Sequence, residues 1–120
     1  MLYHVTALGD WLTDAHLPYA PATLAKDGSV HCLPGKEAVL AVATRYHGRT
    51  MGPLVVLLID EGRLDVPVQC TEPAPGTPLS AFPGAFLRRV LGPVNRNAVV
   101  GTMGIVRDDE GRAQALIERD

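Results

Sequence analysis

The sequence predicts an α+β protein, because several segments with the alternating pattern of strands surround a small number of short helical patterns. The chain has 120 residues, which is a common length for one domain with one core. Its composition is 47% hydrophobic and 20% charged, which is typical of a folded protein rather than a disordered one. We therefore expect one domain over residues 1–120, with one core and one site.

Several segments have the pattern of strands. Residues 2–7 alternate in polarity and carry β-branched and aromatic side chains, and residues 29–33 form a second short strand. The run 54–59 is apolar at every position, which suits a central strand covered on both faces. Residues 66–71 alternate again, and Pro67 favours an edge or strand-start position because it cannot donate a ladder hydrogen bond. Residues 98–106 and 113–117, joined by a polar turn, predict a terminal hairpin.

The helical patterns are shorter. The clearest helix covers residues 39–46, where apolar side chains recur every three or four positions until Gly48. A short helix is expected to begin at Asp10 as its N-cap and to stop before Pro18, and residues 17–29 then form a loop. Residues 73–84 are rich in proline and glycine and form the one loop long enough to act as a flap, for which a binding loop and a plain connector are equally expected. Another short helix is expected at 85–90.

Charge and composition exclude several classes of partner. Lys and Arg number 11 against 13 Asp and Glu, without a basic run, so duplex nucleic acid is not an expected partner. The amino terminus lacks the features of a signal peptide, and the longest aliphatic run is too short to span a bilayer, so we expect no membrane partner and a cytoplasmic location. Cys32 and Cys70 form no CxxC pair, so they are expected to be reduced and buried. The sequence leaves the oligomeric state open.

Strand alternation assigns the candidate functional side chains to faces. In the first strand, His4 and Thr6 share one face, and the opposite face, which we expect to meet the core, carries Tyr3, Val5 and Ala7. In the second strand, His31 and Cys32 point apart, which disfavours both a Cys–His dyad and a zinc site made from these neighbours, so no metal is expected. We expect both histidines on a polar face, where their removal costs the fold little.

Two strand histidines that converge could serve a ligand in several ways. An imidazole can donate to a ribose hydroxyl, transfer a proton or bind a metal. A strand histidine is also commonly a structural residue with its hydrogen bonds satisfied inside the protein. His16 and His47 fall at expected helix ends, where a surface or capping role is favoured.

Ordered short motifs along residues 2–105 resemble the signature of the bacterial domain-of-unknown-function family 952. They are His4-Val5-Thr6, Trp11, Gly28-Ser29-Val30-His31-Cys32, Leu57-Leu58-Ile59-Asp60, Glu72, Gly92-Pro93-Val94 and Ala98-Val99-Val100.

This resemblance implies an ADP-ribosyltransferase-like fold, with a split, mostly antiparallel sheet, two or three short helices and NAD held in a central cleft. It makes His4 the first-strand residue that holds a ribose hydroxyl, with Thr6 beside it, and places His31 on the neighbouring strand of the cleft. Glu72 becomes a candidate acid or electrostatic partner, for which the strand before it must end or bulge.

The chain also departs from the family pattern. Leu33 stands where the family tends to have a serine, while Arg89 and Leu91 replace a histidine and a tyrosine. An arginine can bind pyrophosphate or a carboxylate with two parallel hydrogen bonds, but it cannot act as a general acid or base near neutral pH. Arg89 is therefore a candidate cofactor-binding residue, although a solvated, structural position is an alternative for it.

Three functions follow from these patterns. The first is a divergent enzyme that binds NAD or a related small anionic molecule against His4 and His31. The second is an enzyme of the same fold that does not use NAD and in which the histidines transfer protons, in an isomerisation or ring closure of a small metabolite. The third is a binding module without catalysis.

Overall fold

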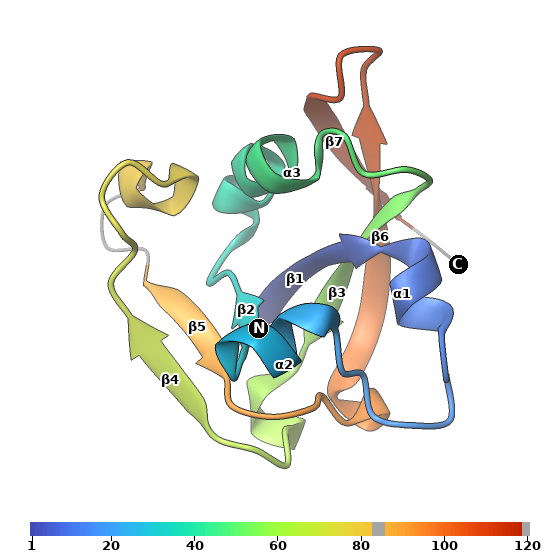
Figure 1. Cartoon of the computed structure of the whole chain (residues 1–120), viewed down its shortest axis with the longest axis vertical. Coiled ribbons are helices and arrows are strands. Elements are labelled where there is room, and N and C mark those ends of the chain that lie inside the picture. The colour runs from blue at the N-terminus through green and yellow to red at the C-terminus, as the bar shows by residue number, and fades with distance from the viewer. Residues whose placement is uncertain (83–85, 119–120) are drawn as a thin grey trace.

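The computed structural model of the chain describes residues 1–82 and 86–118, and within them two antiparallel sheets lie side by side (Figure 1). The four-stranded sheet has the order β1-β3-β6-β7, with bounds Leu2–Ala7, Leu54–Ile59, Val99–Arg107 and Ala113–Glu118. The three-stranded sheet has the order β2-β5-β4, with bounds Val30–Cys32, Leu87–Val90 and Val68–Thr71. Every strand pair is antiparallel, which confirms the predicted α+β class with a split, mostly antiparallel sheet.

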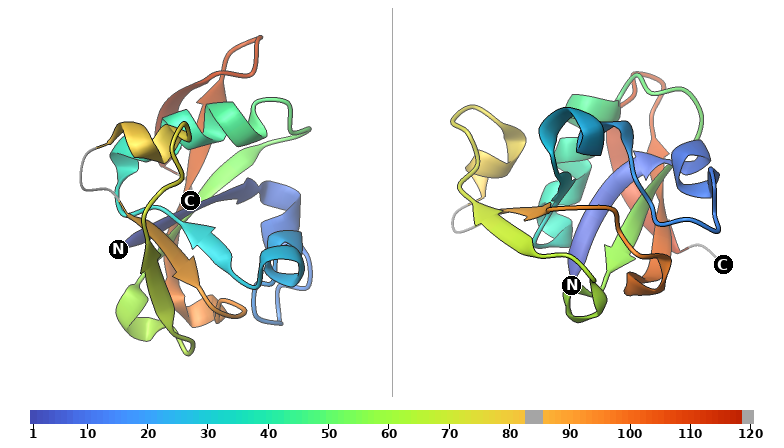
Figure 2. Two further views of the ribbon diagram at one scale, coloured as in Figure 1. Left: turned by 60° about the vertical axis from the view of Figure 1, so that its left-hand side comes forward. Right: turned by 60° about the horizontal axis from the view of Figure 1, so that its bottom comes forward.

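The two sheets meet near the start of β1. Tyr3 and Leu33 form an isolated bridge, in which each backbone N–H donates to the other residue's carbonyl oxygen over 3.0 and 2.7 Å. Beyond this bridge β1 and β2 separate, and two further views show the three-stranded sheet lying to one side of the larger one (Figure 2). The split leaves one edge of β1 free of a continuous ladder.

The apolar run at 54–59 forms the central strand, as predicted. β3 pairs with β1 on one side and β6 on the other, and all of its residues except Leu58 are buried. Two antiparallel neighbours use its backbone donors and acceptors, and its branched side chains enter the core on both faces. The predicted terminal hairpin is likewise confirmed as β6 and β7.

Within the described residues, three α-helices and four short 3-10 segments connect the strands. The α-helices are α1 (Leu8–Leu12), α2 (Ala22–Asp27) and α3 (Val39–His47); the 3-10 segments are η1 (Lys36–Ala38), η2 (Glu61–Arg63), η3 (Pro78–Ala81) and η4 (Arg96–Ala98). α3 confirms the clearest helix prediction and buries Val39 and Ala43. α2 was not expected, because its residues were assigned to a loop; it ends at Gly28, whose φ of 75° suits a residue without a Cβ.

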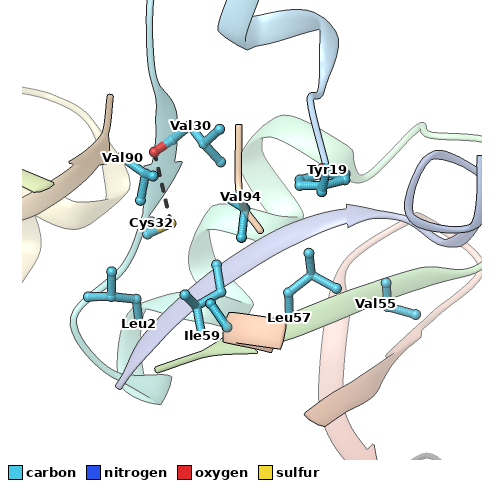
Figure 3. Close-up of a cluster of buried hydrophobic side chains, with 10 residues drawn as sticks. Leu2, Tyr19, Val30, Cys32, Val55, Leu57, Ile59, Val90 and Val94 are labelled. Carbon is cyan, nitrogen blue, oxygen red and sulfur yellow. Dashed lines mark hydrogen bonds between the residues drawn. The ribbon is translucent and has the colours of Figure 1, made fainter. Parts of the chain in front are cut away.

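The larger sheet buries apolar side chains on both of its faces. On one face, α3 packs over Val5, Val56 and Leu54. On the other, the two sheets enclose a second cluster, drawn in Figure 3: Leu2, Tyr19, Val30, Cys32, Val55, Leu57, Ile59, Val90 and Val94. Both sides of β1 are therefore covered, which the alternation of its sequence did not indicate.

Three local predictions were wrong. Residues 87–90 form a strand rather than a helix, because β5 pairs with β2 and β4, which lie far from it in sequence; Ala85, where the helix was expected to begin, is outside the described residues. Cys70 is exposed on the edge strand β4, whereas Cys32 is buried as predicted, and burial raises the pKa of its thiol to about 12. Asp10 lies within α1, which begins at Leu8, and does not cap it.

Candidate functional site

A cavity of about 600 Å³ opens where β1 and β2 separate. Its wall combines β1 and the β2 strand with residues of α1, α2 and α3, and the segment 73–79 closes another side. The loop at 73–84, expected to be either a binding loop or a plain connector, thus contributes to a cavity wall in the part that the structure describes. Of the predicted site residues, His4, Thr6 and His31 line this one cavity.

His4 is buried rather than displayed on an open polar face. Its residue is 7% exposed, and both ring nitrogens have protein partners. Nδ1 lies 2.8 Å from the backbone oxygen of His31, and Nε2 lies 2.9 Å from the hydroxyl oxygen of Tyr19. Burial lowers the pKa of His4 to about 4, and the hydrogen bond to the His31 carbonyl only partly opposes this. His4 is therefore a neutral imidazole near pH 7.

Tyr19 covers His4 and was missed by the sequence analysis, which assigned it to a loop. The Tyr19 residue is 2% exposed, and its ring meets the His4 ring edge-on with centroids 5.4 Å apart. Its backbone N–H and C=O both bond to Val94 over 2.8 Å, which holds the segment against the second cluster. The only available signal was a lone tyrosine between two prolines in an otherwise small-residue stretch.

The neutral state of His4 fixes the direction of a hydrogen-bond chain. Because a carbonyl only accepts, the His4 proton is on Nδ1 and Nε2 must accept. The Tyr19 hydroxyl is the donor within reach of Nε2, so its single proton is used there. Thr6 Oγ1, 2.9 Å from the Tyr19 oxygen, must then donate to Tyr19. We call Thr6, Tyr19 and His4 the relay.

Arg96 holds the segment that carries Tyr19. Its guanidinium donates to the carbonyl oxygens of Trp11, Leu17 and Thr13 over 2.5, 2.8 and 3.0 Å. The same group lies 4.3 Å from the centre of the Trp11 ring, within the range of a cation–π contact. One residue from η4 thus fixes a stretch more than 75 positions earlier in the chain.

His31 contributes to the site through both its backbone and its side chain. Its backbone oxygen accepts from His4, while its side chain is 46% exposed, with Nε2 4.0 Å from a carboxylate oxygen of Asp27. Arg89 is its partner across the β2–β5 pair and donates to the Ser29 hydroxyl over 3.0 Å and to the Asp27 carbonyl over 3.2 Å. Arg89 adjoins His31 but does not line the cavity. We call the His31 and Arg89 side chains the open face.

The structure does not bring Glu72 to the cavity. Glu72 follows β4 on the far strand of the smaller sheet, is exposed and is absent from the described lining. The carboxylate that does line the cavity is Asp10, from α1.

His47 also lines the cavity, contrary to the expected surface role, and burial together with the nearby Arg107 lowers the pKa of His47. His16 is exposed and lies outside the described lining, as expected for a surface residue.

The lining of the cavity has a distinct charge pattern. Across residues 1–82 and 86–118, it includes the Asp10 carboxylate, three histidines and two tyrosines, but neither lysine nor arginine. Within the same described residues, no three metal-ligating side chains of His, Cys, Asp or Glu gather in one place, and no helix is long and apolar enough to cross a membrane. The arrangement suits a ligand that is neutral or positively charged where it meets this wall.

These features define an antiparallel α+β protein with a cavity at the split between its sheets. The model of the protein family of unknown function DUF952 matches residues 6–102, and the chain belongs to that family. Crystal structures of protein CC0527 from Caulobacter crescentus are similar to the chain, at 18% identity for one and 17% for a double mutant. Each comparison gives a TM-score of 0.70 and covers 94% of this chain and 92% of the CC0527 chain. Comparison with curated proteins finds no match.

Proposed function

We propose that the cavity binds the nicotinamide–ribose end of NAD or a related nucleotide, on a fold of the ADP-ribosyltransferase type. The observation that carries this proposal is the cavity at the split between two antiparallel sheets, with His4, Thr6 and His31 in its wall. The nicotinamide ring of NAD is a cation. A wall with the Asp10 carboxylate and no lysine or arginine among its described residues complements that charge.

The remaining part of such a ligand carries negative charge, and the open face offers a partner for it. Arg89 lies beside His31 across the β2–β5 pair, outside the cavity. A guanidinium can bind a pyrophosphate through two parallel hydrogen bonds. In this proposal the ring enters the cavity, while the pyrophosphate passes His31 toward Arg89.

The chemistry would follow from the carboxylate in the wall. The bond between the ribose and the ring would break, with neutral nicotinamide leaving, and the sugar would take on cationic character, which a nearby carboxylate stabilises until a nucleophile bonds to the same carbon. Asp10 lines the cavity and Glu72 does not, so this proposal gives Asp10 the electrostatic role that the family resemblance gave Glu72.

A second candidate is acid–base catalysis on an uncharged metabolite, without NAD. It is favoured by the exposed side chain of His31, which lines the cavity and lies 4.0 Å from the Asp27 carboxylate, and by a described lining without lysine or arginine. Such a histidine can exchange protons with a ligand and with solvent. This candidate predicts binding of a neutral metabolite and none of NAD.

Ligand-dependent melting tests the proposal. NAD at 100 times its dissociation constant should stabilise the fold by about 2.7 kcal/mol, which is a readily measured rise in melting temperature. ADP-ribose, which lacks the nicotinamide ring, should bind more weakly. His31→Ala should abolish most of the rise, whereas His16→Ala, which alters an exposed histidine outside the described lining, should leave it unchanged.

The charge argument has its own matched pair of variants. Asp10→Asn should weaken the binding of NAD more than the binding of ADP-ribose, because only NAD carries the cationic ring. Asp14→Asn, which alters an exposed carboxylate outside the described lining, should affect neither. If neither nucleotide raises the melting temperature, the proposal is wrong, and stabilisation by an uncharged metabolite would favour the second candidate.

A further inference from the structure

The relay ends at a threonine hydroxyl whose proton is already used. Thr6 is 4% exposed and lines the cavity, and in the described part of the chain Tyr19 is its only side-chain hydrogen-bond partner. Because Thr6 donates to Tyr19, and Tyr19 donates to His4, the Thr6 oxygen keeps lone pairs but no free hydrogen. His4 itself keeps no free ring nitrogen, since both are bonded within the protein.

We propose that the relay makes Thr6, rather than His4, the specificity-determining residue of the cavity wall, and that it selects a ligand with a carboxamide over its carboxylate counterpart. This inference rests on the proposed nucleotide site and specifies which ligand that site takes. Thr6 presents an acceptor to the ligand, so a group with an N–H or O–H is favoured there.

The surroundings of Thr6 also favour a carboxamide ligand over a carboxylate ligand. A carboxamide donates hydrogen bonds, whereas an ionised carboxylate only accepts them. A carboxylate ligand would therefore meet an acceptor at Thr6 and a like charge at Asp10, with no lysine or arginine in the described lining to offset either. Like charges and unpaired acceptors act against a wrong ligand and so produce selectivity. Tyr19 is then a positioning residue, because it acts by fixing the proton of Thr6.

The first test determines, without any ligand, which ring nitrogen of His4 carries the proton. Nitrogen NMR of the imidazole of His4 in the intact protein near pH 7 should show a proton on Nδ1 and an accepting Nε2. In Tyr19→Phe, Nε2 should lose its hydrogen-bond donor and its resonance should move accordingly, while the aromatic ring that packs on Trp11 is kept. A proton on Nε2 in the parent protein would overturn the relay.

The second test compares NAD with its deamido counterpart, which carries a carboxylate in place of the carboxamide, by calorimetry. The parent protein should prefer NAD. Tyr19→Phe frees the Thr6 hydroxyl to donate, so the preference should shrink by about tenfold, the ratio expected for one hydrogen bond. Tyr3→Phe is the matched control, since Tyr3 lies on the same strand as Thr6 but outside the described lining. This variant should prefer NAD over deamido-NAD as strongly as the parent protein does.

The outcomes separate this inference from the proposed function. Equal affinity for the two nucleotides in the parent protein, or an unchanged preference in Tyr19→Phe, would overturn the selectivity while leaving nucleotide binding in place. If neither nucleotide binds, the proposed function and the selectivity drawn from it both fail. The NMR result still decides whether the relay runs from Thr6 to His4.

Discussion

The relay and the open face each contain one strand histidine, and these two histidines look alike in the sequence but have opposite surroundings. His4 and His31 each occupy an alternating position on a short strand. His4 is 7% exposed with both ring nitrogens bonded, whereas the side chain of His31 is 46% exposed. The comparison teaches that alternation assigns a side chain to a face, while the segment that packs on that face decides its chemistry.

The covering segment accounts for the difference. Tyr19, held by Arg96 and Val94, closes over His4 from a part of the chain 15 residues away. The open face has Arg89 as its neighbour across the strand pair but no comparable cover in the described residues. The two regions are joined at one atom, since the backbone oxygen of His31 accepts the His4 proton.

The largest expected effect is the cost of removing His4. His4→Ala should lower the free energy of unfolding by about 4 kcal/mol, because it leaves a cavity and deprives the Tyr19 hydroxyl and the His31 carbonyl of their partner. This differs from the small cost expected from the sequence alone. Urea unfolding of the parent and the variant measures it. A cost below about 1 kcal/mol would show that His4 is not held as the structure describes.

The next effect is the response of the fold to acid. The pKa of His4 is about 4 in the folded protein and 6.5 in the unfolded chain, so the unfolded chain takes up the proton first as pH falls. The contribution of neutral His4 to the free energy of unfolding is complete above pH 6.5 and declines between pH 6.5 and 4. The total loss in the free energy of unfolding is about 3 kcal/mol. Urea unfolding from pH 7 to pH 4 should show this loss in the parent. Equal pH dependence in His4→Asn, which cannot take up the proton, would contradict the assignment.

A smaller effect is expected from the residue that holds the covering segment. Arg96→Ala should cost about 2 kcal/mol, because the four carbonyls of Trp11, Thr13, Asp14 and Leu17 lose a charged donor and Trp11 loses a stacked guanidinium. Arg89→Ala, with two hydrogen bonds at the open face, should cost about half as much. Thermal unfolding of both variants compares them. The regions would not differ as described if Arg89→Ala proved the more damaging.

The smallest effect belongs to the open face. His31→Ala should change the free energy of unfolding by less than about 0.5 kcal/mol, since its side chain is half exposed and its backbone oxygen, which His4 uses, stays in place. Denaturant unfolding of this variant beside His4→Ala completes the comparison. A large loss of stability in His31→Ala would remove the distinction between the two histidines.

The sequence was most informative where a pattern is local. The apolar run of β3, the helical spacing of α3 and the turn between β6 and β7 are each decided within a few residues, and all three were predicted. Pro67 had indicated an edge or strand-start position, and it lies just before β4, which is the edge strand of the smaller sheet. The strand assignment of His4, Thr6 and His31 was right as well, so the sequence identified part of the cavity wall.

Local patterns failed where a distant segment decided the outcome. Residues 87–90 have two arginines between apolar ends and give no clear period, so only pairing with β2 and β4 makes them a strand. Cys70 is exposed on β4, the edge strand of the smaller sheet, and alternation alone could not show this.

The sequence by itself determined the α+β class, the central strand and the placement of two histidines on two short strands. Only the tertiary structure decided that His4 is neutral and enclosed, that Tyr19 and Thr6 complete its hydrogen bonds, and that Asp10 rather than Glu72 reaches the cavity. The physical reason is that burial and hydrogen-bond partners come from contacts between segments far apart in the chain. A residue's own neighbours in sequence fix its strand and its face, but not what meets that face.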